Sequence, residues 1–262
     1  MTDIREAAET AAEILLNGGY VERWVEGAIF PSEMAFFIAV CSVAGVDRVI
    51  ESGRQDGYST EILGDWASHN GRQIASVDLE HDAARAAACR QRLAHLPIQL
   101  VKGSAYEEFG RLVRDRAGRR LALIADGPKG WPAISMMAAG VDDRVEVVAL
   151  HNLIPGSAVR ELFERLGGPQ TFYERALNDP GPRWQELRAR EIAFAGGTAA
   201  RSLELSSLGV LRLDDTNRSL FTNAWRTEFG LHQPAMVRAL WQLGAYSAAT
   251  KLYGLSYRLL RR

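Results

Sequence analysis

The feature that most constrains the fold is a regular alternation of short apolar segments with helical segments between residues 46 and 150. The segments expected to be strands are 48–51, 73–78, 98–102, 121–125 and 145–150. Strands and helices that alternate at this spacing form parallel βαβ units. The pattern therefore predicts an α/β fold with a doubly wound, mostly parallel sheet.

The flanking residues are expected to add helices and one antiparallel edge pair. An amphipathic helix is predicted over 4–17, and Pro31-Ser32-Glu33 opens a second helix that runs to about residue 44. Two short strands, 202–205 and 209–213, are expected to close the sheet as an antiparallel pair. The segment 167–190, which precedes these two strands in the sequence, is rich in Gly, Pro and charged residues, which predicts an insertion or lid.

We divide the chain into three parts on this basis. Residues 1–45 form an N-terminal helical segment that contributes to the acceptor site, 46–215 form the ligand-binding α/β domain, and 216–262 form a helical C-terminal extension. The last twelve residues are basic and amphipathic, which would suit a membrane surface. Such a segment more often packs on its own domain or on a second subunit, and a homodimer is the default expectation.

Composition excludes several classes of function. The chain is 47% hydrophobic and 24% charged, as in globular proteins, and its net charge of -1 gives no reason to expect a nucleic-acid partner. Cys41 and Cys89 are far apart and belong to no C-x-x-C pair, which argues against disulfides and structural zinc. No secretory signal pattern opens the chain, and the apolar stretch 34–46 is too short to span a bilayer. We expect a cytoplasmic protein.

The loop after the first predicted strand, Glu51-Ser-Gly-Arg-Gln-Asp-Gly-Tyr-Ser59, predicts a ligand site. Ligands of doubly wound sheets bind at the carboxyl ends of the strands. Gly53 and Gly57 permit a tight turn close to a ligand, and the next helix offers free N–H groups. Three residues separate the two glycines, so the dinucleotide fingerprint G-x-G-x-x-G is absent, and so is a P-loop. This spacing disfavours a nicotinamide dehydrogenase, the main alternative enzyme.

This loop resembles the methyl-donor loop of class I S-adenosylmethionine-dependent O-methyltransferases, of the catechol type or of the bacterial sugar type. The resemblance continues in order over 31–157, with one motif at each successive strand end. It implies that Asp78 binds the ribose hydroxyls and that Ser104 and Ala105 border the adenine. The cofactor-binding residues that it implies are Glu51, Gly53, Gly57, Tyr58, Ser59, Asp78, Ser104, Ala105 and Asp126.

The motifs Asp126-Gly-Pro-Lys129 and His151-Asn152 resemble the catalytic segments of that family, and imply a divalent cation held by Asp126, His151 and Asn152. His151 stands where the family has Asp. Magnesium prefers oxygen donors, so this difference weakens the magnesium prediction and leaves manganese, or no metal, open. We predict His151, Lys129 and Asp126 as catalytic, with His151 as a metal ligand or a general base and Lys129 as a charge beside the acceptor oxygen. A structural role for His151, and a solvated Lys129, stay open.

Five aromatic residues are candidates for the wall of an acceptor cleft: Tyr20, Trp24, Phe30, Trp131 and Trp184. Aromatic faces stack on sugar rings and on arenes, although each residue could instead pack in the core. The insertion and the tail favour a larger polar acceptor. The predicted function is methyl transfer to a hydroxyl of a sugar or glycan precursor, as in polysaccharide biosynthesis. The alternatives are a phenolic or natural-product acceptor, and a methyltransferase-fold protein that binds without turnover.

Overall fold

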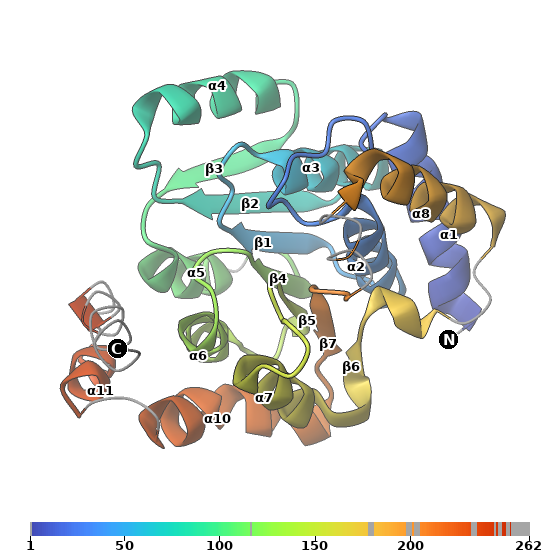
Figure 1. Cartoon of the computed structure of the whole chain (residues 1–262). Helices are drawn as coiled ribbons and strands as arrows, with labels where there is room; N and C mark the ends of the chain where they lie inside the picture. The colour runs from blue at the N-terminus through green and yellow to red at the C-terminus, as the bar shows by residue number, and fades with distance from the viewer. Residues whose placement is uncertain are drawn as a thin grey trace.

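The computed structural model has a seven-stranded sheet with helices on both faces (Figure 1). It describes residues 2–115, 117–177, 181–197, 201, 205–231, 235–243, 245, 248–249 and 252. Most of the predicted basic tail, 251–262, lies outside the described residues. None of the described helices is long and apolar enough to cross a membrane.

Five parallel strands form the centre of the sheet. They are β1 (Arg48–Ser52), β2 (Gln73–Asp78), β3 (Ile98–Lys102), β4 (Leu121–Ala125) and β5 (Val145–Leu150). The five strands predicted between residues 46 and 150 are confirmed, and the clearest signal was the apolar run of β4, which is buried along its whole length. The order along the sheet is β3-β2-β1-β4-β5, so the direction of winding reverses between β1 and β4. The loops after these two strands therefore flank the topological switch point, where such folds bind ligands.

The remaining two strands form the antiparallel edge. Strand β7 (Gly209–Arg212) runs antiparallel to β5 on one side and to the two-residue β6 (Thr171–Phe172) on the other. The predicted strand at 209–213 is confirmed, but its outer partner is β6 instead of 202–205. Residues 202–204 lie outside the described residues, and Leu205 is in a turn.

The segment 167–190, predicted as an insertion or lid, contains regular secondary structure on both sides of residues 178–180, which lie outside the described residues. Part of this segment is β6, and another part is the start of α8 (Pro182–Ala195), which packs on α1 (Thr2–Asn17) and α2 (Pro31–Val43). Trp184 and Leu187 are buried there. Of the described Gly and Pro residues of this segment, Gly167 ends α7 (Ala158–Gly167), Gly168 and Pro169 form a short 3-10 helix, and Gly181 and Pro182 open α8.

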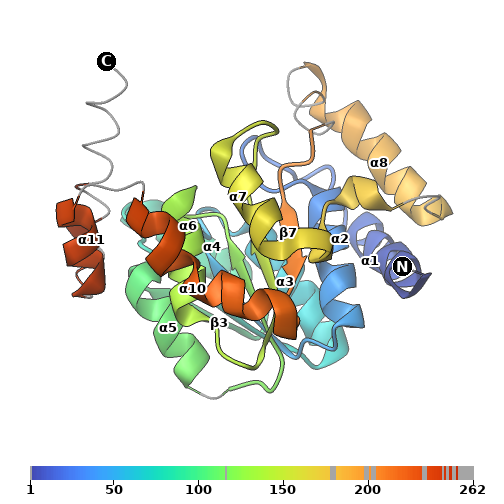
Figure 2. The same cartoon turned by 90° about the horizontal axis from the view of Figure 1, so that it is seen from below.

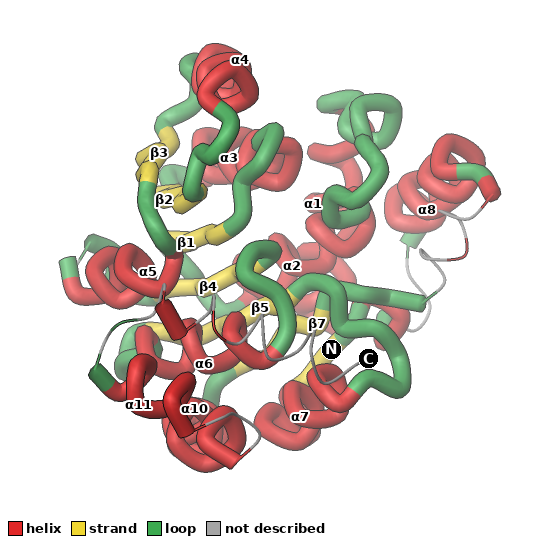
Figure 3. Tube along the Cα trace, turned by 60° about the vertical axis from the view of Figure 1, so that its left-hand side comes forward, coloured by secondary structure: helices red, strands yellow, loops and turns green. Residues whose placement is uncertain are grey.

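Helices α1, α2 and α8, with α3 (Tyr58–Asn70), cover one face of the sheet (Figure 3). Helix α2 lies against α1, α8 and β5, which explains why it is apolar on all sides. Residues 25–29, in the connection between α1 and α2, lie near the carboxyl ends of β1 and β4.

The opposite face is covered by α5 (Ala105–Arg114), α6 (Trp131–Gly140), α7 (Ala158–Gly167) and α10 (Asp215–Leu231). Helix α10 packs along α6 and α7, so the start of the predicted C-terminal extension belongs to the body (Figure 2). Helix α11 (Ala235–Gln242) follows beside it. Helix α4 (Ala83–Leu93) lies beyond β3, and two short 3-10 turns, Gly168–Gln170 and Glu174–Ala176, flank β6.

Candidate active site

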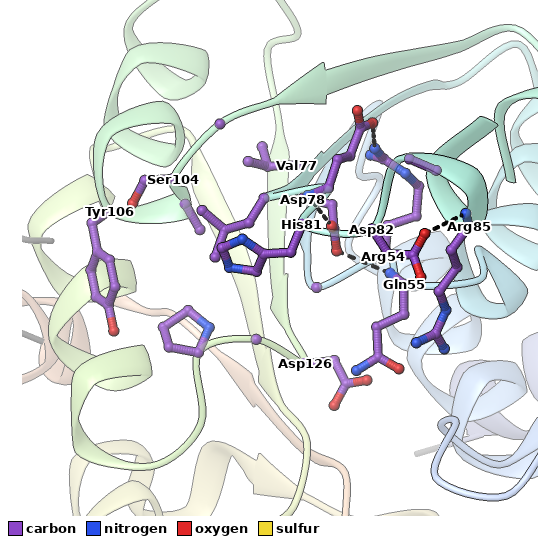
Figure 4. Close-up of a pocket in the computed structure, with 18 residues that line it drawn as sticks. Arg54, Gln55, Val77, Asp78, His81, Asp82, Arg85, Ser104, Tyr106 and Asp126 are labelled. Atoms are coloured by element: carbon purple, nitrogen blue, oxygen red, sulfur yellow. Dashed lines mark hydrogen bonds and ion pairs between the residues drawn. The ribbon is translucent and has the colours of Figure 1, made fainter. Parts of the chain in front are cut away.

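A cavity of about 400 Å³, here called the donor cavity, lies at the carboxyl ends of β1 to β4. Five predicted cofactor-binding residues line it: Gly53, Asp78, Ser104, Ala105 and Asp126. They come from four different loops and converge on one space (Figure 4). The fold therefore assembles the sites that the sequence places at successive strand ends.

Gly53 holds the loops after β1 and β4 in direct contact. Its φ is +89°, and a Cβ there would lie 2.4 Å from the backbone nitrogen of Gly127. The carbonyl of Ser52 accepts hydrogen bonds from the backbone N–H groups of Asp126 (2.9 Å) and Gly127 (3.2 Å). Only glycine fits at position 53, because any side chain would push apart the two loops at the switch point.

Glu51 lies beneath the loop and does not line the donor cavity. Its buried carboxylate accepts hydrogen bonds from the hydroxyls of Ser59 (2.6 Å), Thr60 (2.5 Å) and Ser76 (2.6 Å). Burial raises the pKa of Glu51, and the three hydroxyl donors oppose that shift. The residue joins the start of α3 to β2 and so fixes the shape of the loop.

Three other predicted residues also act on the loop from outside the donor cavity. Gly57, with φ +81°, precedes α3, and a Cβ there would lie 2.7 Å from Cys89 Sγ. The buried Tyr58 donates its hydroxyl hydrogen to the carbonyl of Tyr20 at 2.6 Å. Tyr58 and Ser59 line a narrow passage of about 50 Å³ next to the cavity.

Asp78 is placed to accept hydrogen bonds from a ligand in the donor cavity. Its two oxygens each accept one backbone N–H group, from Gln55 (3.0 Å) and from Glu80 (2.7 Å). A carboxylate offers about four acceptor positions, so both oxygens retain capacity for a diol. Sequence reasoning missed Arg54, which also lines the cavity. Its buried side chain donates to the Ser76 carbonyl at 2.7 Å and pairs with Glu80.

A second cavity of about 400 Å³, here called the aromatic cleft, lies on the other side of the narrow passage. Trp24 and Phe30 stack in its wall, with ring centroids 4.7 Å apart. The full lining is Trp24, Glu26, Gly27, Ala28, Phe30, Lys129, His151, Asn152, Ile154, Pro155, Leu205 and Ser207. Asp126 lines both the donor cavity and the passage, so it stands between the two larger spaces.

The other predicted aromatic residues have different places. Tyr20 and Trp184 are buried in the core on the α1 face of the sheet, and Trp131 packs against the core of the opposite face. Sequence periodicity cannot separate the two roles, because an aromatic side chain suits a cleft and a core equally well.

The predicted catalytic residues form one polar cluster at the edge of the cleft. His151 Nδ1 lies 2.5 Å from Asp126 Oδ1 and 2.8 Å from Asn152 Nδ2. Lys129 Nζ donates to Asn152 Oδ1 at 2.5 Å and lies 3.6 Å from Asp126 Oδ1. The closer contact with the Asp126 carboxylate assigns the ring proton to Nδ1, and Asn152 Nδ2, which is also a donor, then makes no hydrogen bond to that nitrogen. Asn152 has φ +64°, a conformation that Asn tolerates better than most residues.

The atoms predicted to bind a divalent cation make other contacts in this structure. His151 Nδ1 contacts Asp126 and Asn152, and the ammonium group of Lys129 contacts the side-chain oxygens of Asp126 and Asn152. A cation bound at these oxygens would have to displace that ammonium group.

Sequence reasoning missed a cluster of buried glutamates behind the cleft. Glu33 accepts the backbone N–H of Ser207 at 2.5 Å, and Glu174 accepts the hydroxyl of Ser206 at 2.6 Å. Burial raises the pKa of Glu174 and that of Glu191 to about 7. These residues are far apart in sequence, so no local pattern could have grouped them. They support the segment that forms one wall of the aromatic cleft.

No protein-family model matches the chain, and no curated protein sequence matches it. Among solved structures, similarity is found to an O-methyltransferase from Bacillus cereus in complex with SAH, at 13% identity over 78% of this chain and 91% of that one, with a TM-score of 0.44. A second is the O-methyltransferase TomG from Streptomyces achromogenes in complex with SAM, at 17% identity over 80% and 90%, with a TM-score of 0.43. A third is the SAH-bound Podospora anserina methyltransferase PaMTH1, at 12% identity over 77% and 88%, with a TM-score of 0.44. At these values the likeness does not establish what this chain binds or catalyses.

Proposed function

We propose that the chain is an S-adenosylmethionine-dependent O-methyltransferase that acts on a hydroxyl of a small molecule. One observation carries the proposal: the donor cavity and the aromatic cleft adjoin a single passage lined by Asp126, with the polar cluster on the cleft side. Methyl transfer needs two ligands that meet at their reacting atoms, and two adjacent cavities provide that arrangement.

The donor cavity suits the cofactor in size and in chemistry. Its volume of about 400 Å³ lies in the ordinary range for cofactor sites. Gly53 lets the backbone approach a ligand, and Asp78 can accept from the ribose hydroxyls. Ser104 occupies the N-cap position of α5 without a side-chain capping bond, beside the base-binding end. S-adenosylmethionine, when bound, supplies a sulfonium methyl group for transfer to an oxygen nucleophile.

The chain's own residues prepare that oxygen. Asp126 holds Nδ1 of His151, which leaves Nε2 as the ring nitrogen that takes the proton of the acceptor hydroxyl. The ammonium group of Lys129 lines the cleft and stabilises the negative charge that develops on the acceptor oxygen. Asp126 compensates the charge of the imidazolium that forms.

The lining of the cleft favours a flat, largely apolar acceptor. Trp24 and Phe30 form a stacked wall, while Ile154 and Leu205 at the rim are 62% and 48% exposed. Exposed apolar side chains around a cavity suit a ligand that covers them. The sugar or glycan acceptor expected from the sequence has no specific support in this lining. The expected homodimer and the cytoplasmic location stay predictions.

Calorimetric titration with S-adenosylhomocysteine tests the proposal. We expect saturable binding with one site per chain, followed by transfer of labelled methyl from S-adenosylmethionine to members of a panel of hydroxylated aromatic compounds. Absence of binding would remove the proposal. Binding without transfer to any aromatic, sugar or natural-product hydroxyl would favour the non-catalytic alternative.

A further inference from the structure

We propose that this site works without a divalent cation, and that the ammonium group of Lys129 supplies the positive charge in its place. The inference rests on the proposed function and deepens it, because it states how the acceptor oxygen is held. It is carried by the contacts among Asp126, Lys129, His151 and Asn152.

The oxygen of Asn152 is already bound to a cation. Lys129 Nζ lies 2.5 Å from Asn152 Oδ1 and 3.6 Å from Asp126 Oδ1, between the two oxygens that a metal ion would need. A second positive ion at the same oxygens would be repelled by the ammonium, and Asp126 is the one carboxylate of the cluster. The charge of the cluster is therefore balanced without a metal.

The imidazole of His151 is also engaged. Its Nδ1 lies 2.5 Å from Asp126 Oδ1, a direct hydrogen bond. This bond places the ring proton on Nδ1, so the lone pair with which Nδ1 would bind a metal ion is occupied while the contact is made. His151 is 5% exposed, and its packing holds it in this contact.

This arrangement has a consequence for the acceptor. A divalent ion can chelate two neighbouring oxygens, whereas an ammonium group contacts one oxygen at a time. The side chain of Lys129 is 51% exposed and lines the cleft, so it can reach a ligand there. We infer that the acceptor needs one hydroxyl and no neighbouring oxygen, which separates this site from one built for vicinal diols.

Direct measurement of Mn²⁺ binding by electron paramagnetic resonance tests the inference without an acceptor. We expect the wild-type protein to bind no Mn²⁺ at concentrations up to about 1 mM, the weak end of protein affinities for divalent cations. The double variant K129A/H151D removes the ammonium and places a second carboxylate beside Asp126. We expect it to bind one Mn²⁺ per chain, and the single variants K129A and H151D to bind at least about tenfold more weakly.

Titration with S-adenosylhomocysteine is the control for folding and for the proposed function. Wild type and all variants should bind it equally, with or without EDTA. Stoichiometric binding of Mn²⁺ by the wild type, lost in Asn152→Ala, would overturn the inference while leaving the proposed function standing. Failure to bind S-adenosylhomocysteine would instead remove the proposed function.

Turnover gives a second readout. EDTA should leave wild-type transfer to mono-hydroxylated aromatic compounds unchanged, whereas loss of an essential Lewis-acid metal would reduce it about a hundredfold or more. Transfer that required both an added divalent ion and a vicinal diol would contradict the inference.

Discussion

The donor cavity and the aromatic cleft are built in different ways. The donor cavity is formed by loops that each follow a strand, so the register of the sheet fixes their positions. The cleft combines the connector 24–30, the loop at 151–155 and the segment 205–207, which are distant in sequence. One site follows from the fold itself, whereas the other depends on segments that can change without altering the sheet.

Each site rests on buried glutamate, but the partners differ. Glu51 beneath the donor loop is surrounded by three hydroxyl donors. Behind the cleft, Glu33, Glu174 and Glu191 lie near one another with Arg188 as the cation, which is 3.3 Å from Glu191 and 3.9 Å from Glu174. Hydroxyl donors stabilise one buried carboxylate, whereas one arginine cannot neutralise three. Burial raises the carboxyl pKa on both sides, and on the cleft side the pKa of Glu174 and that of Glu191 reach about 7, which puts their titration near neutral pH.

The largest expected effect is that of Gly53→Ala. The new Cβ would overlap the backbone of Gly127 and separate the two loops at the switch point. We expect binding of S-adenosylhomocysteine to be lost and the free energy of unfolding to fall by about 2–5 kcal/mol, from left-handed strain together with overpacking. Calorimetry and urea denaturation measure the two quantities.

Gly71→Ala is the matched control. Gly71 also has a positive φ, +63°, but nothing lies within 4 Å of its added Cβ. It should lose about 1–2 kcal/mol from strain alone and bind the cofactor product normally. Equal losses of binding in both variants would show that the contact between the loops does not matter.

The next largest effect is expected for His151→Ala, which should change turnover without changing binding in the donor cavity. Removal of the general base should reduce turnover by about 10²–10⁴-fold. Binding of S-adenosylhomocysteine should be unchanged, since His151 lines the cleft and not the donor cavity. Single-turnover transfer of labelled methyl, with calorimetry beside it, makes the comparison. Near-normal turnover would leave His151 a structural role.

The two cavities also differ in how far the sequence could predict them. The five parallel strands and the convergence of Gly53, Asp78, Ser104 and Asp126 were predictable, because each motif is local and the sheet brings strand ends together. The inward turn of Glu51, away from the donor cavity, was not predictable, since an acidic residue at a strand end can face either way. The pairing of Lys129 with Asn152 depends on two loops whose relative placement is set by packing.

A smaller effect is expected for Asp78→Asn in the donor cavity. An amide accepts hydrogen bonds at one oxygen and lacks charge, so it binds a ribose diol less well. The loss of charge-assisted hydrogen bonds, about 1.5–3 kcal/mol, should raise the dissociation constant for S-adenosylhomocysteine by about 10–150-fold. Turnover at saturating donor should be little changed. Asp82→Asn is the control, because Asp82 also lines the cavity and, like Asp78, accepts two backbone N–H groups, those of Ala84 and Arg85. It therefore reports the cost of weakening such backbone bonds.

The smallest effect concerns the glutamates behind the cleft. The pKa of Glu174 and that of Glu191 rise from an ordinary 4.5 to about 7, chiefly because burial disfavours the charged forms. These two groups hold more protons in the folded state than in the unfolded state between these values. Their contribution to stability is therefore fully present below pH 4.5 and is lost as the pH rises through 7. Glu174→Gln should flatten this decline and stabilise the protein at pH 8 by about 1–3 kcal/mol.

Urea denaturation at pH 5, 6, 7 and 8, spanning the pKa of about 7, measures the slope. Glu186→Gln is the control at a partly exposed position of α8. A hydrogen bond from Arg183 lowers the pKa of Glu186, so it stays ionised from pH 5 to 8 and its replacement should keep the wild-type slope. An unchanged slope in Glu174→Gln would mean that Arg188 neutralises the cluster, and the contrast with the donor side would then disappear.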